Sequence, residues 1–205
     1  MPETPKAGDP ALAGVTNRVI GNNALVVVAA VAEARRLGYV PVVLTRRLQG
    51  EAREVARVFA AILHEADATG QPARRPACLI AAGETTVTVR GQGRGGRCQE
   101  FALALVGEIA ALRDVVVLAA GTDGSDGPTE AAGAVVDPTT LARARARGLD
   151  PRAALAANDS HPVFGALGDL VETGATGTNL MDLYLGLLGG SRRRAPADGA
   201  GRPGA

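Results

Sequence analysis

Hydrophobic and polar positions follow two patterns along this chain: short apolar or alternating runs, and longer runs in which apolar residues recur at helical spacing. Apolar or alternating runs predict strands at 18–20 (RVI), 39–44, 77–81, 83–90 (GETTVTVR), 115–120 and 133–136. Helical patterns cover 24–37, 51–66, 99–112, 138–147, 151–157 and 163–167, and the segment 180–188 fits either type. Strands that alternate with helices predict an α/β protein with α/β/α layers and a mostly parallel sheet.

The same pattern divides the chain into five segments. Residues 1–16 and 191–205 are rich in Pro, Gly and Ala without periodicity, so we expect a disordered arm and a disordered tail. Residues 68–76 (ATGQPARRP) predict a linker between two unequal folded parts, 17–67 and 77–190. The shorter part is too small to complete a sheet, and we interpret it as the remnant of a larger α/β domain. Its uncovered sheet face predicts self-association.

Composition narrows the class of protein and its partners. The 22 basic and 21 acidic residues nearly cancel and only 2% of residues are aromatic, which argues against a nucleic-acid partner. No apolar run is long enough to cross a membrane, and the acidic, proline-rich first ten residues do not fit a signal peptide. Cys78 and Cys98 form no disulfide framework and have no metal-ligand spacing, so we expect reduced thiols in a cytoplasmic protein.

A glycine-rich loop, 91–97 (GQGRGGR), precedes the helix predicted over 99–112. Its glycines allow the backbone to approach an anion, and the helix N-terminus adds amide donors and a positive dipole. Arg94 and Arg97 add guanidinium groups that suit phosphate. The loop therefore predicts a phosphate or cofactor cradle made by Gly91, Gly93, Arg94, Gly95 and Gly96, and the alternative is a plain flexible connection.

The same loop matches the dinucleotide fingerprint G-x-G-x-x-G through Gly91, Gly93 and Gly96. Two features argue against that assignment. The preceding segment alternates polar and apolar residues, whereas a first Rossmann strand is buried on both faces. The next acidic residue after a strand is Asp123, well beyond the offset of roughly 20 residues for a ribose-binding acid. A nicotinamide-dependent reductase stays open as an alternative.

A second polar loop, 121–129 (GTDGSDGPT), directly follows the buried strand 115–120. Asp123 and Asp126 stand three apart in it, and carboxylate oxygens on a pliable loop suit Mg²⁺. The alternative is an Asx turn, in which both aspartates bond only to local amides.

Four further polar residues stand at element boundaries. Asn158, Asp159 and Ser160 lie between two apolar runs, where they suit either a hydroxylated substrate or a helix cap. Glu84 follows the strand 77–81 and is a candidate general base or metal partner.

Four runs of this chain together resemble a known family. The runs AAGETTVTVRGQGRGGRCQEFALAL, VVVLAAGTDGSDGPTEAAGAVVD, AANDS and GATGTNLMDLYL are similar to the MOFRL domain, the C-terminal part of glycerate 2-kinases once called hydroxypyruvate reductases. The resemblance covers residues 77–188, and residues 17–66 resemble the closing stretch of the family's N-terminal domain.

The resemblance implies ATP-dependent phosphorylation of the 2-hydroxyl of D-glycerate, with Mg²⁺, in a cleft between two α/β domains. By position, Glu84, Arg97 and Asp123 match catalytic residues of that cleft. Arg97 would hold phosphate or the glycerate carboxylate, Asp123 with Asp126 would organise Mg²⁺ or the attacking hydroxyl, and Glu84 would orient one of these groups.

The family's catalytic lysine lies in the N-terminal domain, whereas the single lysine here is Lys6. We therefore expect the chain to be incomplete as a kinase and to need the missing domain as a partner. A non-catalytic anion- or nucleotide-binding module is a further alternative.

Overall fold

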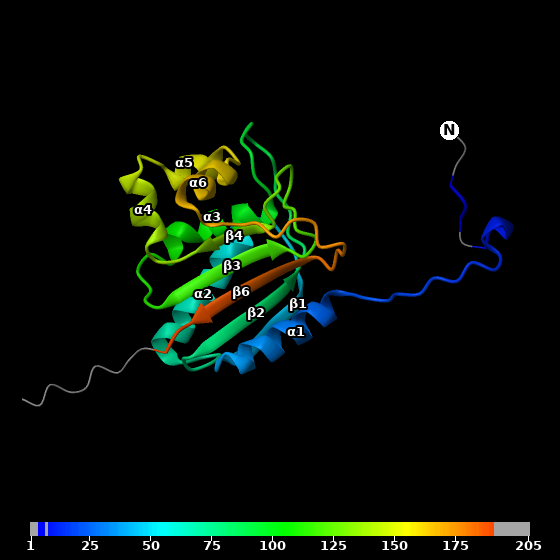
Figure 1. Cartoon of the computed structure of the whole chain (residues 1–205), viewed down its shortest axis with the longest axis horizontal. Coiled ribbons are helices and arrows are strands. Elements are labelled where there is room, and N and C mark those ends of the chain that lie inside the picture. Colours follow the sequence, from blue (N-terminus) through cyan, green and yellow to red (C-terminus); the bar gives the residue numbers. More distant parts are fainter. Residues whose placement is uncertain (1–3, 7, 191–205) are drawn as a thin grey trace, which may run out of the picture.

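The structure is a computed structural model that describes residues 4–6 and 8–190 (Figure 1). One six-stranded sheet has the order β1-β2-β6-β3-β4-β5. Its strands are β1 Val40–Leu48, β2 Ala77–Gly83, β3 Val115–Gly121, β4 Gly133–Val136, β5 Leu170–Val171 and β6 Asp182–Leu188. The helices are η1 Pro10–Leu12, α1 Asn23–Arg36, α2 Ala52–Thr69, α3 Arg97–Glu108, α4 Thr140–Ala146, α5 Pro151–Ala156 and α6 Ser160–Leu167. The predicted α/β class is confirmed.

The strand directions differ from the prediction of a mostly parallel sheet. Only β1 and β2 pair in parallel, whereas β6 runs antiparallel to both β2 and β3, β4 to β3, and β5 to β4. The segment 122–132 joins β3 to β4 without a helix, which suits an antiparallel pair because a parallel pair needs a longer crossover. The last strand, β6, inserts between β2 and β3, a pairing that no local pattern specifies.

This insertion brings three segment ends to one edge of the sheet. β2 and β3 run in the same direction on the two sides of β6, and their last residues, Gly83 and Gly121, both pair with Asp182, the first residue of β6. The loops that follow β2 and β3 therefore emerge on either side of Asp182. The two loops thus start at the same end of the sheet, although β6, the strand between β2 and β3, runs antiparallel to both.

Two hydrophobic layers enclose the sheet. On one face α2 and α3 cover the larger core, in which Phe101 packs against Phe59 at a centroid distance of 5.7 Å and against Tyr184 at 4.6 Å. The apolar positions of α2 recur at helical spacing, and the helix ends at Gly70, whose φ of +75° favours glycine. On the other face α1 packs Val27 against a smaller apolar cluster of β2 and β6.

Two predicted strands are wrong. Residues 18–20 form no strand, because no strand edge lies beside them in the described chain, and Ile20 is 90% exposed. The segment 83–90 leaves the sheet after Gly83 and crosses toward α2, where Glu51 accepts a hydrogen bond from the Thr88 amide. The ambiguous segment 180–188 contains β6.

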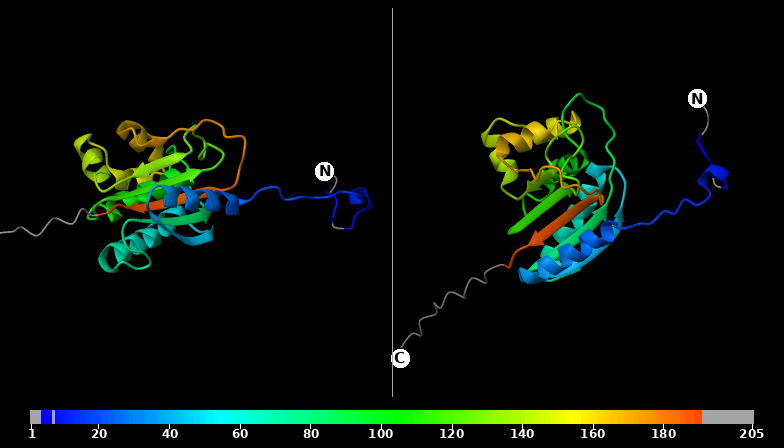
Figure 2. Two further views of the ribbon diagram at one scale, coloured as in Figure 1. Left: turned by 60° about the horizontal axis from the view of Figure 1, so that its bottom comes forward. Right: turned by 45° about the vertical axis from the view of Figure 1, so that its right-hand side comes forward.

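The two predicted folded parts share one sheet and one core, since β1 pairs with β2 and α2 packs on α3. Residues 8–20, which include η1, extend away from this body (Figure 2). The predicted disordered tail 191–205 lies outside the described residues. Within the described residues, no helix is long and apolar enough to cross a membrane.

Candidate functional site

An open pocket of about 590 Å³ lies at the sheet edge where β2 and β3 end. The segment after β2, the glycine-rich loop and the first turn of α3 form its walls. Its lining residues are Glu84, Thr85, Thr86, Val87, Val89, Gly93, Gly95, Gly96, Arg97, Glu100, Gly127, Pro128 and Asn158. The predicted residues Glu84, Arg97 and Asn158 and three of the loop glycines thus line one pocket. The other predicted site residues do not line it, namely Gly91, Arg94, Asp123, Asp126, Asp159 and Ser160.

Arg97 is the central cation of this pocket. It is the first residue of α3, and its Nε and Nη2 donate to the two oxygens of Asp182 over 2.7 and 3.1 Å. Its Nη1 lies 3.0 Å from Glu84 Oε1. Hydrogen bonding to Asp182 raises the pKa of Arg97, so the guanidinium stays charged.

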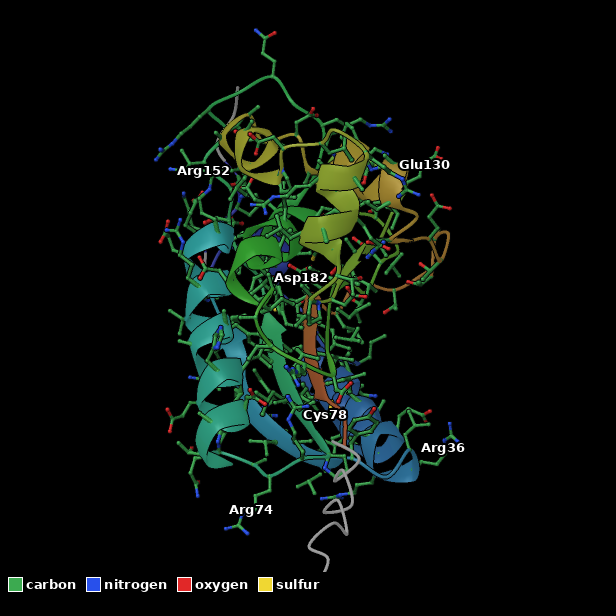
Figure 3. The ribbon with its side chains drawn as sticks, turned by 90° about the vertical axis from the view of Figure 1, so that its left-hand side faces the viewer. Arg36, Arg74, Cys78, Glu130, Arg152 and Asp182 are labelled. Carbon is green, nitrogen blue, oxygen red and sulfur yellow. The ribbon has the colours of Figure 1, made fainter. Side chains whose placement is uncertain are left out.

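Asp182 is the first residue of β6 (Figure 3), and only 1% of it is exposed. Its Oδ2 accepts a hydrogen bond from the Tyr184 hydroxyl over 3.2 Å, and that hydroxyl lies 3.0 Å from Thr85 Oγ1. Burial raises the pKa of Asp182, and the Arg97 guanidinium opposes this shift. Sequence reasoning missed Asp182. The available signal was an acid opening the otherwise apolar run 182–188 (DLYLGLL).

Asp123 lies at the same edge, directly after β3. A Cβ atom placed on Gly121 would lie 3.2 Å from Asp123 Oδ1 and 3.5 Å from Asp182 Oδ1. Asp123 Oδ1 accepts the Ser125 amide over 3.0 Å, and Oδ2 accepts the Asn179 amide group over 3.3 Å. Glu84 and Arg97 therefore meet at the pocket, and Asp123 lies near Asp182 at the same end of the sheet without lining the pocket.

Asp126 faces away from Asp123 and into the protein. Its Oδ1 accepts the Cys98 amide over 3.0 Å and its Oδ2 the Gln99 amide over 2.8 Å, so it caps α3 from another loop. Burial raises the pKa of Asp126, because only 4% of the residue is exposed. Both oxygens are thus taken by amides, and the two aspartates do not fit a shared Mg²⁺ site. Among the described residues, no group of three or more His, Cys, Asp or Glu is arranged to hold a metal ion.

The glycines of the loop serve close packing as much as ligand access. A Cβ on Gly91 would meet the Ala157 carbonyl, one on Gly93 would meet Asp159, and one on Gly95 would meet the Ser160 hydroxyl. Glycine is needed at these positions because the loop lies directly on the segment 157–160. β2 ends well before Gly91, so the strand–turn–helix setting of a dinucleotide fingerprint is absent here.

Two polar residues after α5, Asn158 and Asp159, hold this loop in place. Asn158 Oδ1 accepts the amides of Arg90 and Gly91 over 2.7 and 3.0 Å. Asp159 Oδ1 accepts the Arg94 amide over 2.8 Å. Ser160 is the first residue of α6, and no side-chain cap bond forms there. The contacts of Asn158 and Asp159 thus anchor the loop backbone.

Three amides remain available at the pocket. The backbone N–H groups of Gly95, Gly96 and Arg97 donate to no acceptor in the part of the chain that the structure describes, and all three residues are half-buried. They stand at the N-terminus of the twelve-residue helix α3, whose dipole favours an anion. Together with the Arg97 guanidinium they form a set of donors suited to phosphate or carboxylate.

Comparison with known proteins agrees with this geometry. The model of the MOFRL family matches residues 77–182, which is more than half of the chain. The chain belongs to the MOFRL family. The matched range runs from the first residue of β2 to Asp182 and therefore contains every pocket-lining residue named above.

Relatives of this MOFRL chain are longer than the chain itself. It is 42% identical over 188 residues to the D-glycerate 2-kinase of Thermotoga maritima, covering 92% of this chain and 44% of that protein. It is 43% identical over 189 residues to a protein of Agrobacterium vitis whose name carries the words hydroxypyruvate reductase, covering 91% and 42%. The crystal structure of glycerate kinase from Thermotoga maritima superposes with a TM-score of 0.81 over 83% of this chain and 41% of that one. The chain thus spans less than half the length of these relatives.

Proposed function

We propose that this chain provides the C-terminal half of an ATP-dependent glycerate 2-kinase, which phosphorylates the 2-hydroxyl of D-glycerate and releases ADP. The observation that carries the proposal is the set of donors at one pocket, the Arg97 guanidinium with the free amides of Gly95 and Gly96. A phosphoryl group that spreads charge over several oxygens needs such donors. The names of the relatives support the kinase over other anion-binding enzymes.

In this proposal each of three charged residues has a separate role. Arg97 binds the transferred phosphoryl group or the glycerate carboxylate. Glu84, which is exposed and lies 3.0 Å from Arg97 Nη1, orients the guanidinium or the incoming hydroxyl. Asp123 has one oxygen contacted by Asn179 at the long distance of 3.3 Å, and it is the residue that would hold the Mg²⁺ of a bound nucleotide. Mg²⁺ commonly takes one or two carboxylates and completes its shell with water and phosphate.

Catalysis on this proposal needs a second protein segment. The resemblance implies a catalytic lysine in the N-terminal domain of the family. The single lysine of this chain is Lys6, which is far from the pocket residues in sequence. We infer that the segment corresponding to the rest of the relatives supplies the lysine and the other wall of the cleft. We place the reaction in the cytoplasm because Cys78 and Cys98 are both free, whereas oxidising compartments favour disulfides.

A coupled ADP-release assay tests the proposal. The chain is mixed with D-glycerate and Mg-ATP, alone and with the separately expressed N-terminal part of the Thermotoga maritima relative. We expect turnover that requires glycerate in the mixture, and a loss of about 100-fold on Arg97→Ala. Arg74→Ala, an exposed arginine at the opposite end of the sheet, is the matched control and should leave turnover unchanged (Figure 3).

The positive control is the same N-terminal part combined with its own C-terminal part. Turnover in that control without turnover in the mixture would reject the kinase proposal. A nicotinamide-dependent reductase is the second candidate, because the names of two relatives from Agrobacterium vitis carry the words hydroxypyruvate reductase. Fluorescence titration with NADH and NADPH decides it, since a reductase must bind one of them saturably. Phosphate binding without turnover in any mixture would instead favour a non-catalytic anion-binding module.

A further inference from the structure

Asp182 touches Arg97 but does not line the pocket. It lies behind the guanidinium at the start of β6, and 1% of it is exposed, so it cannot contact a ligand in the pocket. We propose that Asp182 is a positioning residue, which holds the Arg97 guanidinium so that its remaining donors face an incoming phosphate or carboxylate. The proposal rests on the proposed function of this pocket as an anion site.

The donors of Arg97 divide into two sets. A guanidinium has five N–H groups in a fixed plane. Asp182 takes one from Nε and one from Nη2, which is the side-on edge of the group. The donors left are those of Nη1 and the second N–H of Nη2, and two neighbouring donors of this kind bind an oxyanion in a bidentate manner.

The two carboxylates beside Arg97 differ in how easily an anion displaces them. Glu84 is exposed, with 51% of its side chain accessible, so water can replace its contact with Nη1. Asp182 is buried, and removing its contact would leave a charge without a partner. An incoming anion therefore competes with Glu84 and leaves the bond to Asp182 in place.

Asp182 is itself held on rigid structure. It is the first residue of an inner strand, and its backbone pairs with Gly83 on one side and Gly121 on the other. Its Oδ2 accepts the hydroxyl of Tyr184, whose ring packs on Phe101 at 4.6 Å. A site residue supported from a strand in this way is placed more precisely than one supported from a loop.

Inorganic phosphate is the probe for this proposal, titrated calorimetrically into the full chain. We expect Asp182→Asn, which keeps the size of the side chain, to weaken phosphate binding about tenfold. In the Arg97→Ala background the same substitution should cause no further weakening, because Asp182 acts through Arg97. The matched control is Asp169→Asn, which breaks a similar bidentate pair with Arg143 away from the pocket and should leave phosphate affinity unchanged.

A second readout follows the geometry of Arg97 directly. In ¹⁵N-arginine spectra we expect a slowly exchanging Nε–H signal from Arg97 in the unmodified chain and its loss in Asp182→Asn. A purely structural ion pair would change the stability of the fold but would not change phosphate affinity and this signal together.

Three results would overturn the proposal. Unchanged phosphate affinity in Asp182→Asn would remove the positioning role alone and leave the anion site intact. Equal weakening with and without Arg97 would show that Asp182 acts by another route. Absence of phosphate binding by the unmodified chain would overturn both this proposal and the proposed function. If Asp182→Asn does not fold, Tyr184→Phe decides, with about twofold weakening expected and unchanged affinity contradicting the proposal.

Discussion

Asn158 links three segments around the pocket, and its replacement by Ala tests whether it anchors the glycine-rich loop. Its Oδ1 accepts the amides of Arg90 and Gly91 over 2.7 and 3.0 Å. Its Nδ2 donates to Glu100 Oε2 over 2.8 Å. The other oxygen of Glu100, Oε1, accepts a hydrogen bond from Nη2 of Arg53, a residue of α2, over 2.7 Å. Asn158 is 7% exposed, so these bonds form away from bulk water.

The expected loss of stability follows from those contacts. Two neutral hydrogen bonds contribute about 1 kcal/mol each and the bond to a carboxylate about 2 kcal/mol, for a maximum near 4 kcal/mol. Glu100 keeps Arg53, and the amide of the exposed residue Arg90 gains water once the side chain is gone, which offsets part of the loss. We therefore expect Asn158→Ala to lower the free energy of unfolding by about 2 kcal/mol.

Urea denaturation measures this change, and a loss of about 2 kcal/mol corresponds to a midpoint lower by about 1 M. Amide hydrogen exchange should also accelerate at Arg90 and Gly91. Asn179→Ala is the matched control, because Asn179 is exposed and its two side-chain bonds, from Nδ2 to Asp123 over 3.3 Å and from the Met181 amide to Oδ1 over 3.1 Å, lie at the surface. A wild-type midpoint and unchanged exchange in Asn158→Ala would refute the anchoring role and favour direct contact with substrate.

Three further predictions concern single side chains. Gly95→Ala directs a methyl group at the Ser160 hydroxyl and should cost about 1–3 kcal/mol in thermal unfolding, whereas an unchanged midpoint would show that the loop is not packed there. Asp126→Ala removes the acceptor for two first-turn amides of α3 and should cost about 3 kcal/mol in urea; wild-type stability with weaker Mg²⁺ binding would instead support a metal role. Burial raises the pKa of Asp137, but hydrogen bonds from Thr139 and Thr140 and the charge of Arg143 together outweigh burial and leave the pKa below its ordinary value. Because the folded-state pKa is the lower one, the stabilisation is present above the unfolded pKa and is lost as the pH falls through the folded pKa. Asp137→Asn should thus cost less than about 1 kcal/mol at pH 7, and this cost should shrink as the pH falls below the ordinary pKa of an aspartate; an equal cost in urea series at neutral and at acid pH would contradict this.

The elements of the fold were largely predictable, whereas the strand order was not. The apolar run 115–120 and the segment 133–136 became β3 and β4 with bounds within one residue, because each is short, β-branched and bordered by turn residues. The placement of β6 between β2 and β3 depends on pairing between residues that lie 61 to 111 positions apart in the sequence. The local pattern of apolar and polar residues predicts where a strand forms but does not indicate which other strand it pairs with.

The convergence of Glu84, Arg97 and Asp123 was predictable because all three lie close to strand ends or the helix that follows them. The inward roles of Asp126 and Asn158 were not. In sequence both look like exposed loop residues, and only the folded loops show that their oxygens accept backbone amides. Asp182 was missed because a single acid beside an apolar run gives no hint of an arginine 85 positions earlier.

Titration with 2-phosphoglycerate, the product of the proposed reaction, tests the central claim most directly, with the backbone amides followed by ¹H–¹⁵N correlation spectra. The product carries both a phosphate and a carboxylate, and the pocket that should bind them is lined by Gly95, Gly96 and Arg97, whose amides donate to no acceptor within the described residues. We predict that these three signals shift most, saturate with ligand and cease to shift in Arg97→Ala. Saturable shifts elsewhere with these three unmoved, or no saturable shift at all, would contradict the account.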